Sequence, residues 1–352
     1  MRRIVSNTMS IDPQRRSGLL ASKLRALVRN RWDVADVDPG RIPGGATLLV
    51  EGNAWVLLDE DPERRLGAAL AWSAKAGAGE LHVLVDSPEA AAHLARRASS
   101  FVRPPSVWQI VGRDLVAAAS EPAPPFAVPA PQAELYRPVL AAAGLDVVVE
   151  RGQLIGEVRG LEVARVVLDG PDGTARVDAG VGRFDQEASS MMFADLSETD
   201  AVARAAGILR GYRRPGAPLH PLNQLVPERW LRWLLVRRPE LVGAEELSPV
   251  ESVLGRRNLA EPSVATAVGT GADGGPLVVT CSTGVDLELV PAAADDRLAH
   301  APEARLVLAV PAHDALAVTT ALAGALSRPA EVIAVDNDWR SVAPAMPGSG
   351  VV

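Results

Sequence analysis

One order of elements recurs near both ends of this chain of 352 residues: two strands, then helix, strand, helix and strand. It is predicted first over residues 46–111, where ATLLVEG and AWVLLDE flank a turn at Gly52 and Asn53. It is predicted again over 277–335, with LVVTCS and VDLELV as a strand pair turning at Gly284. Strands that alternate with helices indicate layered α/β lobes. The two segments fit an internal repeat, and two independent examples of a common pattern are the alternative.

The sequence between these lobes predicts a different kind of sheet. Residues 133–210 indicate a helix, an antiparallel meander and a second helix that begins at the capping box Ser-Glu-Thr-Asp (197–200). The stretch EPAPPFAVPAPQ, with five prolines, predicts an extended spacer before it. The fold class is therefore α/β in the two lobes and α+β overall. The expected parts are a flexible arm (1–16), an N-terminal α/β lobe (17–120), the spacer (121–132), a central α+β region (133–262), a C-terminal α/β lobe (263–338) and a disordered tail (339–352).

Composition limits the classes of function. The formal net charge of −7 argues against general nucleic-acid packaging and against attraction to anionic membranes. The single cysteine, Cys281, excludes an internal disulfide and fits a reducing compartment. No apolar run reaches the length of about 20 residues that a membrane helix needs, and the N-terminus lacks a signal-peptide core. We expect a soluble, cytoplasmic protein with no membrane partner.

Several familiar sites are excluded by the residues themselves. GTGADG (269–274) is followed by a strand, so it predicts a hairpin turn and not a dinucleotide fingerprint. With Lys23 and Lys75 as the only lysines, a P-loop cannot be built. Cys281 lacks a nearby imidazole and is interpreted as a buried structural thiol. His220, in a proline-rich loop, is a weak catalytic candidate, and a structural hydrogen bond is the favoured interpretation. No cofactor is predicted.

Local charge provides one candidate binding site. Residues 201–260 contain ten arginines against five glutamates, with Tyr212, Trp230 and Trp233 interleaved. Arginine binds phosphate through paired hydrogen bonds and aromatic rings stack on bases, so a nucleic acid or a phosphorylated ligand is the candidate partner. The ligand-binding candidates on the helix 227–238 are Arg229, Arg232 and Arg238. The competing interpretation is an amphipathic helix whose arginines only meet solvent.

The pattern of residues 227–238 also predicts in which direction its side chains point. We expect its three candidate arginines to project to solvent from one side. Leu231, Leu234 and one of the two tryptophans are expected to point into the core.

The central carboxylates are the second candidate site. The order helix, strands, helix over 133–210 resembles the core of PD-(D/E)XK nucleases, in which acids on neighbouring strands hold Mg²⁺ beside a lysine. The resemblance implies Mg²⁺ at Glu157 or Glu162 together with Asp178. The sequence has Ala179 and Gly180 after Asp178, with no lysine in reach.

Arginine competes with metal for the same acids. Residues 159–183 contain almost one arginine for each carboxylate, so ion pairs on the sheet are the alternative to a metal site. We expect ion pairs for Glu157 and Asp178. Asp185 and Glu187 follow a glycine-rich bend and are expected to stay available for a ligand.

The segments GVGRFDQEA, HPLNQL and GVDLELVPAAADDR resemble an actinobacterial family of hypothetical proteins, and the resemblance implies no mechanism. The first expectation is therefore a protein that acts by binding. The alternative is a divergent metal-dependent nuclease or phosphoester hydrolase centred on residues 150–190, with Mg²⁺ as its cofactor.

Overall fold

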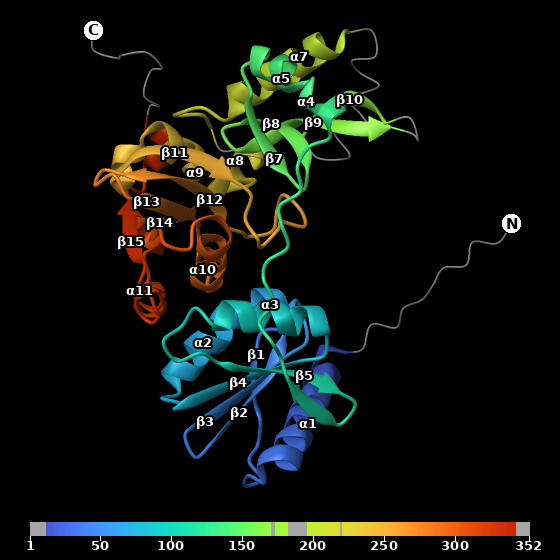
Figure 1. The fold of residues 1–352 in the computed structure, drawn as a ribbon, viewed down its shortest axis with the longest axis vertical. Coiled ribbons are helices and arrows are strands. Elements are labelled where there is room, and N and C mark those ends of the chain that lie inside the picture. The colour runs from blue at the N-terminus through green and yellow to red at the C-terminus, as the bar shows by residue number, and fades with distance from the viewer. Residues whose placement is uncertain (1–11, 170–172, 182–195, 219, 343–352) are drawn as a thin grey trace, which may run out of the picture. The chain divides into compact units, whose positions relative to one another are not determined.

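A computed structural model describes residues 12–169, 173–181, 196–218 and 220–342 of the chain (Figure 1). The chain divides into two compact units, residues 1–122 and 123–352. The predicted central region and C-terminal lobe both fall within the second unit. Asp185 and Glu187 lie outside the described residues. Among those that are described, no helix is long and apolar enough to cross a membrane.

The first unit is one six-stranded sheet with helices on both faces. Its strands stand in chain order, with β3, β4 and β5 parallel and the other neighbours antiparallel. The elements are α1 (Pro13–Trp32), β1 (Gly40–Ile42), β2 (Gly45–Val50), β3 (Asn53–Leu58), η1 (Pro62–Arg64), α2 (Leu66–Lys75), β4 (Glu80–Val85), α3 (Pro88–Ala98), β5 (Ser106–Val111) and β6 (Asp114–Ala117).

Alternation along β3 explains this layering. Trp55 and Leu57 pack with Leu24 and Val28 of α1, while Val56 on the opposite face belongs to the core under α2 and α3. Two predictions need correction here. Helix α1 begins after Asp12, whose carboxylate caps it, so the last residues of the predicted arm are helical. The β2–β3 turn lies at Glu51 and Gly52, both with positive φ, one residue before the predicted turn.

The second unit begins with a four-stranded antiparallel meander, as the sequence predicts. The strands run in the order β10-β9-β8-β7, and α4, α5 and α7 belong to its core. The Ser197 hydroxyl accepts a hydrogen bond from the Asp200 amide at 3.1 Å, which confirms the predicted helix start. The elements are α4 (Pro131–Glu134), α5 (Arg137–Ala142), β7 (Asp146–Glu150), β8 (Gln153–Val158), β9 (Leu161–Asp169), β10 (Thr174–Ala179) and α7 (Glu198–Tyr212).

The rest of the second unit builds a five-stranded mixed sheet. Strands β11, β12 and β13 are antiparallel, and β13, β14 and β15 are parallel. The elements are α8 (Pro221–Gln224), α9 (Pro227–Arg237), η2 (Pro239–Val242), β11 (Ala244–Val250), β12 (Ala265–Gly271), β13 (Pro276–Cys281), α10 (Leu289–His300), β14 (Arg305–Pro311), η3 (Ala312–Asp314), α11 (Ala317–Gly324), β15 (Glu331–Val335) and η4 (Trp339–Ser341).

Two expectations for this sheet are wrong. VDLELV is not a strand: its first four residues form a loop and its last two begin α10. The hairpin partner of β13 is β12, and the predicted GTGADG turn is confirmed at their junction. The tail expected to be disordered from residue 339 contains η4, in which Trp339 is buried against Trp230.

The two mixed sheets share a pairing pattern. In each, an antiparallel pair is followed by two parallel strands, as β2-β3-β4-β5 and as β12-β13-β14-β15. The predicted element order therefore occurs in both units, with the second hairpin formed by residues other than those expected. Duplication of one ancestral segment remains a prediction.

Helix α9 is the element that positions the candidate site. Its apolar residues pack on β11, β12 and β13 through Leu231, Leu234 and Leu235, which are essentially unexposed. Its other side carries the arginines and meets β7 and β8 of the meander. A helix covered on two sides cannot present a wide polar face to water.

Candidate anion-binding cleft beside a buried ion network

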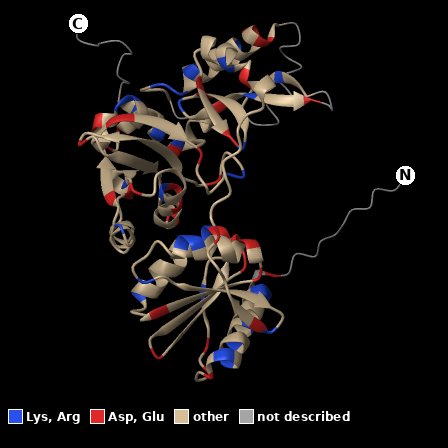
Figure 2. Cartoon of the chain, in the orientation of Figure 1, with Lys and Arg blue, Asp and Glu red and all other residues tan. Residues whose placement is uncertain are grey.

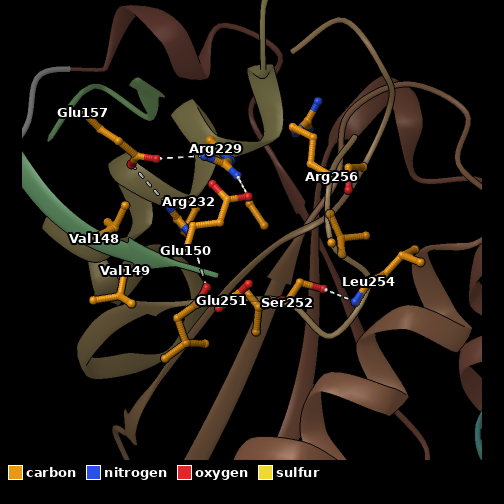
Figure 3. A pocket seen from close by; sticks show the side chains of 16 residues that line it. Val148, Val149, Glu150, Glu157, Arg229, Arg232, Glu251, Ser252, Leu254 and Arg256 are labelled. Atoms are coloured by element: carbon orange, nitrogen blue, oxygen red, sulfur yellow. Dashed lines mark hydrogen bonds and ion pairs between the residues drawn. The ribbon is translucent and has the colours of Figure 1, made fainter. Parts of the chain in front are cut away.

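A chain of ion pairs fills the space between α9 and the meander (Figure 3). Arg229 donates to Glu150 of β7 at 2.8 Å and to Glu157 of β8 at 3.1 Å. Arg232 donates to the second oxygen of Glu157 at 3.1 Å. Glu157 is 2% exposed, so its charge is compensated by the two guanidinium groups and not by water. We call these four residues the buried ion network.

The network corrects one expectation and confirms another. Arg229 and Arg232, expected in solvent, are 9% and 7% exposed because the meander covers their side of α9. Arg238 lies past the end of α9, is less deeply buried and pairs with Glu240. The expected inward direction of Leu231, Leu234 and Trp230 is confirmed.

The pKa values of Arg229 and Glu150 show that the charges of the buried ion network compensate one another. Burial alone would lower the pKa of Arg229, but Glu157 and Glu150 raise it above its ordinary value. Burial likewise works to raise the pKa of Glu150, and Arg229 outweighs that effect and lowers it. Both groups therefore stay charged at neutral pH.

A second buried pair fixes the loop that follows β11. Arg256 donates to Glu228, in the first turn of α9, and to the carbonyls of Asn258 and Glu261. Both members of the Arg256–Glu228 pair are under one tenth exposed. The loop 256–261 is thereby held against the N-terminal end of α9.

A cleft of about 590 Å³ opens beside this loop, and we call it the arginine cleft. Its volume lies in the range of small-molecule sites. Arginine outnumbers acid in its lining, within a chain of net charge −7. The charged residues that line it are Arg151, Arg165, Arg229, Arg256, Arg257, Glu150, Glu162 and Asp178.

The arginines of the cleft differ in how far they are already compensated. Arg165 forms a two-pronged pair with Glu162, with both N–O distances 2.8 Å, and also donates to Gln153. Arg257, at the exposed rim, pairs with Glu261 at 2.5 Å. Arg151 donates to the Arg256 carbonyl, and among the described residues no carboxylate lies within ion-pair distance of its guanidinium. Arg151 is therefore the guanidinium best placed to receive an added anion.

Two of the predicted metal ligands line this cleft. Glu162 and Asp178 both face it, and Asp178 stands opposite Arg165 in the β9–β10 register. Each is engaged by arginine, Glu162 by Arg165 and Asp178 by Arg176. The expectation of an ion pair on the sheet is confirmed for Asp178. Glu157 is also ion-paired, as expected, but its partners are arginines of α9 and not of the sheet. Within the described part of the chain, no three potential ligand side chains are grouped to hold a metal ion.

The other single-residue candidates have structural surroundings. His220 caps α8, where its Nδ1 accepts from the Leu222 amide at 3.3 Å, and its ring stacks on Tyr212 at 4.1 Å. Cys281 is fully buried at the end of β13, as the sequence predicts. Burial raises the pKa of its thiol to about 12, so the thiolate needed for nucleophilic attack is scarce at neutral pH.

Sequence reasoning missed Arg151, and a local signal marks it. Arg151 and Gly152 both have positive φ in the tight turn between β7 and β8, and Arg159 and Gly160 repeat this between β8 and β9. Two-residue turns of this type favour Asn, Asp or Gly at the first position. Glu51 takes the same conformation in the β2–β3 turn, so the strained position alone assigns no task. At Arg151 it coincides with the arginine cleft, and this coincidence makes the side chain a candidate.

No protein-family model matches this chain, and searches of curated proteins and of solved structures found no match either. The chemistry of the site must therefore be inferred from its own residues.

Proposed function

We propose that this protein acts by binding, and that its second unit holds a phosphate-bearing anion in the arginine cleft. The observation that carries the proposal is the excess of arginine over carboxylate in a cleft of about 590 Å³. Guanidinium groups bind phosphate oxygens through paired, charge-assisted hydrogen bonds. Single-stranded nucleic acid presents a flexible series of phosphates, and we propose it as the ligand class.

Burial and existing ion pairs indicate which arginines shape the cleft and which can contact the ligand. Arg229 and Arg256 are buried and committed to glutamates, so they fix the shape of the cleft. Arg151 and Arg257 are exposed and stand at the opening, where they meet the ligand first. Acidic and basic positions are interspersed over the second unit (Figure 2), so the attraction is local to the cleft.

The test uses a fluorescently labelled single-stranded oligonucleotide and anisotropy at several salt concentrations. We expect binding at low salt that weakens as salt rises, because each phosphate contact releases counterions. Arg151→Asn, which suits the left-handed turn, and Arg257→Gln are each expected to weaken binding about tenfold and to reduce the salt slope by about 0.7.

Arg305→Gln is the matched control, since Arg305 is an exposed arginine of the same unit that pairs with Glu331 away from the cleft. It should leave the affinity unchanged. Absence of binding at low salt, or an equal loss in the control, would overturn the proposal.

A metal-dependent nuclease or phosphoester hydrolase is the second candidate. What favours it is the position of Glu162 and Asp178 in one cleft with the arginines. Against it stand the arginine partner of each acid and the absence of a lysine near Asp178 in the sequence.

Calorimetry with Mn²⁺ separates the two candidates. We expect no micromolar binding of Mn²⁺, because Arg165 and Arg176 already neutralise the two acids. Micromolar binding that Glu162→Ala or Asp178→Ala abolishes would favour the hydrolase. Glu303→Ala, at an exposed acid elsewhere in the unit, is the control.

A further inference from the structure

Three arginines from distant parts of the sequence gather around Trp230. Arg213 follows α7, Arg159 lies in the β8–β9 turn and Arg340 lies in η4. Their guanidinium carbons are 4.5, 5.9 and 5.8 Å from the centre of the Trp230 ring. Arg159 also lies 5.0 Å from the centre of the Trp233 ring, and Arg340 lies 4.9 Å from that of Trp339. The charges of Arg159 and Arg340 act on Arg213 and lower its pKa, so the grouping of three like charges needs an explanation.

None of the three has a carboxylate partner of the kind that the buried arginines near α9 have. Within the described residues, no carboxylate lies at ion-pair distance from Arg159, Arg213 or Arg340, whereas Arg229, Arg232 and Arg256 each have one. Arg213, fully buried, donates to the carbonyls of Arg159, Leu222 and Leu225 at 2.7–3.0 Å. Among the residues that the structure describes, none accepts from the buried Nε groups of Arg213 and Arg340.

The pKa values of the three arginines reflect the same lack of a compensating negative charge. Burial lowers the pKa of Arg213 to about 9; the charge of Glu157 opposes this, and those of Arg340 and Arg159 add to it. Burial also lowers the pKa of Arg159, with Arg237 adding to the effect, and that of Arg340. The indole ring offsets part of this cost through its contacts with the three guanidinium groups.

The backbone at Arg159 is a separate observation in favour of a task. Arg159 has φ of 48° and Gly160 has φ of 78°, in a turn pressed against α9. A Cβ on Gly160 would stand 2.4 Å from the backbone carbon of Arg229, so no other residue fits at this glycine. Asparagine would fit the Arg159 position with less strain, and arginine stands there instead.

We propose that Arg159, Arg213 and Arg340 form an anion site of their own, and that it takes a diphosphate-type group. Three guanidinium groups match an anion with two or three charges better than a single carboxylate, and Arg159 and Arg340 can each offer paired donors. These two are half-buried and give the anion an approach, while the fully buried Arg213 adds its charge and its Nε donor. None of the three lines the arginine cleft, so this site does not depend on the proposed function.

Pyrophosphate is the probe, titrated into the full chain by calorimetry at low salt. We expect saturable binding with a rise in Tm, because the anion stabilises only the folded site. Arg159→Asn and Arg340→Gln are each expected to weaken this binding tenfold or more. Arg159→Asn relieves the turn, so a loss of binding in that variant cannot be attributed to poor folding.

Two comparisons locate the pyrophosphate. Arg305→Gln removes an unrelated surface charge and should bind pyrophosphate as the unchanged protein does. Arg151→Asn makes the same change at the other end of β8 and removes an arginine of the arginine cleft, so it reports any pyrophosphate held there. We expect the loss of affinity in Arg159→Asn and in Arg340→Gln to exceed any loss in Arg151→Asn. No binding by the unchanged protein, or full binding by Arg159→Asn and Arg340→Gln, would overturn the inference. Loss in Arg151→Asn alone would also overturn it, and would leave the arginine cleft supported as the proposed site.

Discussion

Replacing Glu157 by alanine is expected to destabilise the second unit by about 3–5 kcal/mol. The reason is that Glu157 is the shared partner of two buried guanidinium groups. Without it Arg229 keeps Glu150, but Arg232 keeps only the Val250 carbonyl at 3.4 Å. A buried charge without compensation costs far more than a lost surface contact.

Urea denaturation followed by tryptophan fluorescence measures this loss as a lower midpoint at unchanged slope. If the two units unfold in separate transitions, only one should move. Glu303→Ala removes an acid that is 90% exposed and pairs with Arg328, so it should cost less than about 1 kcal/mol. A loss below that value for Glu157→Ala would contradict the assigned role. Adding Arg232→Met should recover part of the stability, because it removes the stranded charge.

Asp296 is expected to make the stability of the second unit depend on pH. Its side chain is fully buried in α10, and burial raises its pKa to about 7. It accepts hydrogen bonds from the Ser252 hydroxyl at 3.0 Å, the Val253 amide at 2.7 Å and the Thr266 hydroxyl. These donors support the charged form but do not compensate for the loss of water.

The sign follows from which state holds the proton. Between the unfolded pKa near 4 and the folded pKa near 7, the folded chain binds more protons, so stability falls as pH rises through that window. Above pH 7 both states are ionised and the contribution is flat. Between pH 5 and pH 8 the loss should be about 2–3 kcal/mol.

Asp296→Asn should remove this part of the pH dependence. The asparagine oxygen can accept from Ser252 and Val253, and its amide can donate to the Thr266 hydroxyl, which can turn toward Thr280 at 3.2 Å. The comparison is the free energy of unfolding of both proteins at pH 5 and pH 8. Other titrating groups cancel in the difference. Equal pH slopes in the two proteins would contradict the prediction.

Local sequence patterns predicted an element correctly where the burial of one of its faces determines its structure. The meander followed from alternating apolar residues, and the start of α7 followed from the Ser197 capping box. VDLELV misled for the same reason, since its alternation imitates a strand. In the fold, Leu289 and Val290 are buried at the first turn of α10, and the preceding residues form the loop after β13.

The direction of the α9 arginines could not be read from the sequence. PERWLRWLLVRR has the pattern of a helix with one solvent-exposed side, and nothing in it indicates that a second sheet covers that side. The partners, Glu150 and Glu157, lie more than 70 residues earlier in the chain. The sequence singled out Glu157 as a residue with an ionic role but not Glu150, and only the fold shows which arginines these two acids meet.

The shared partner Glu157 also bears on how the chain emerges from the ribosome. Glu157 is made 75 residues before Arg232. At typical synthesis rates that interval lasts about 4–15 s. After β10 is complete at Ala179 the meander still has no α9, and the Glu157 carboxylate lacks both of its arginine partners. The buried ion network therefore closes only late in the synthesis of the second unit.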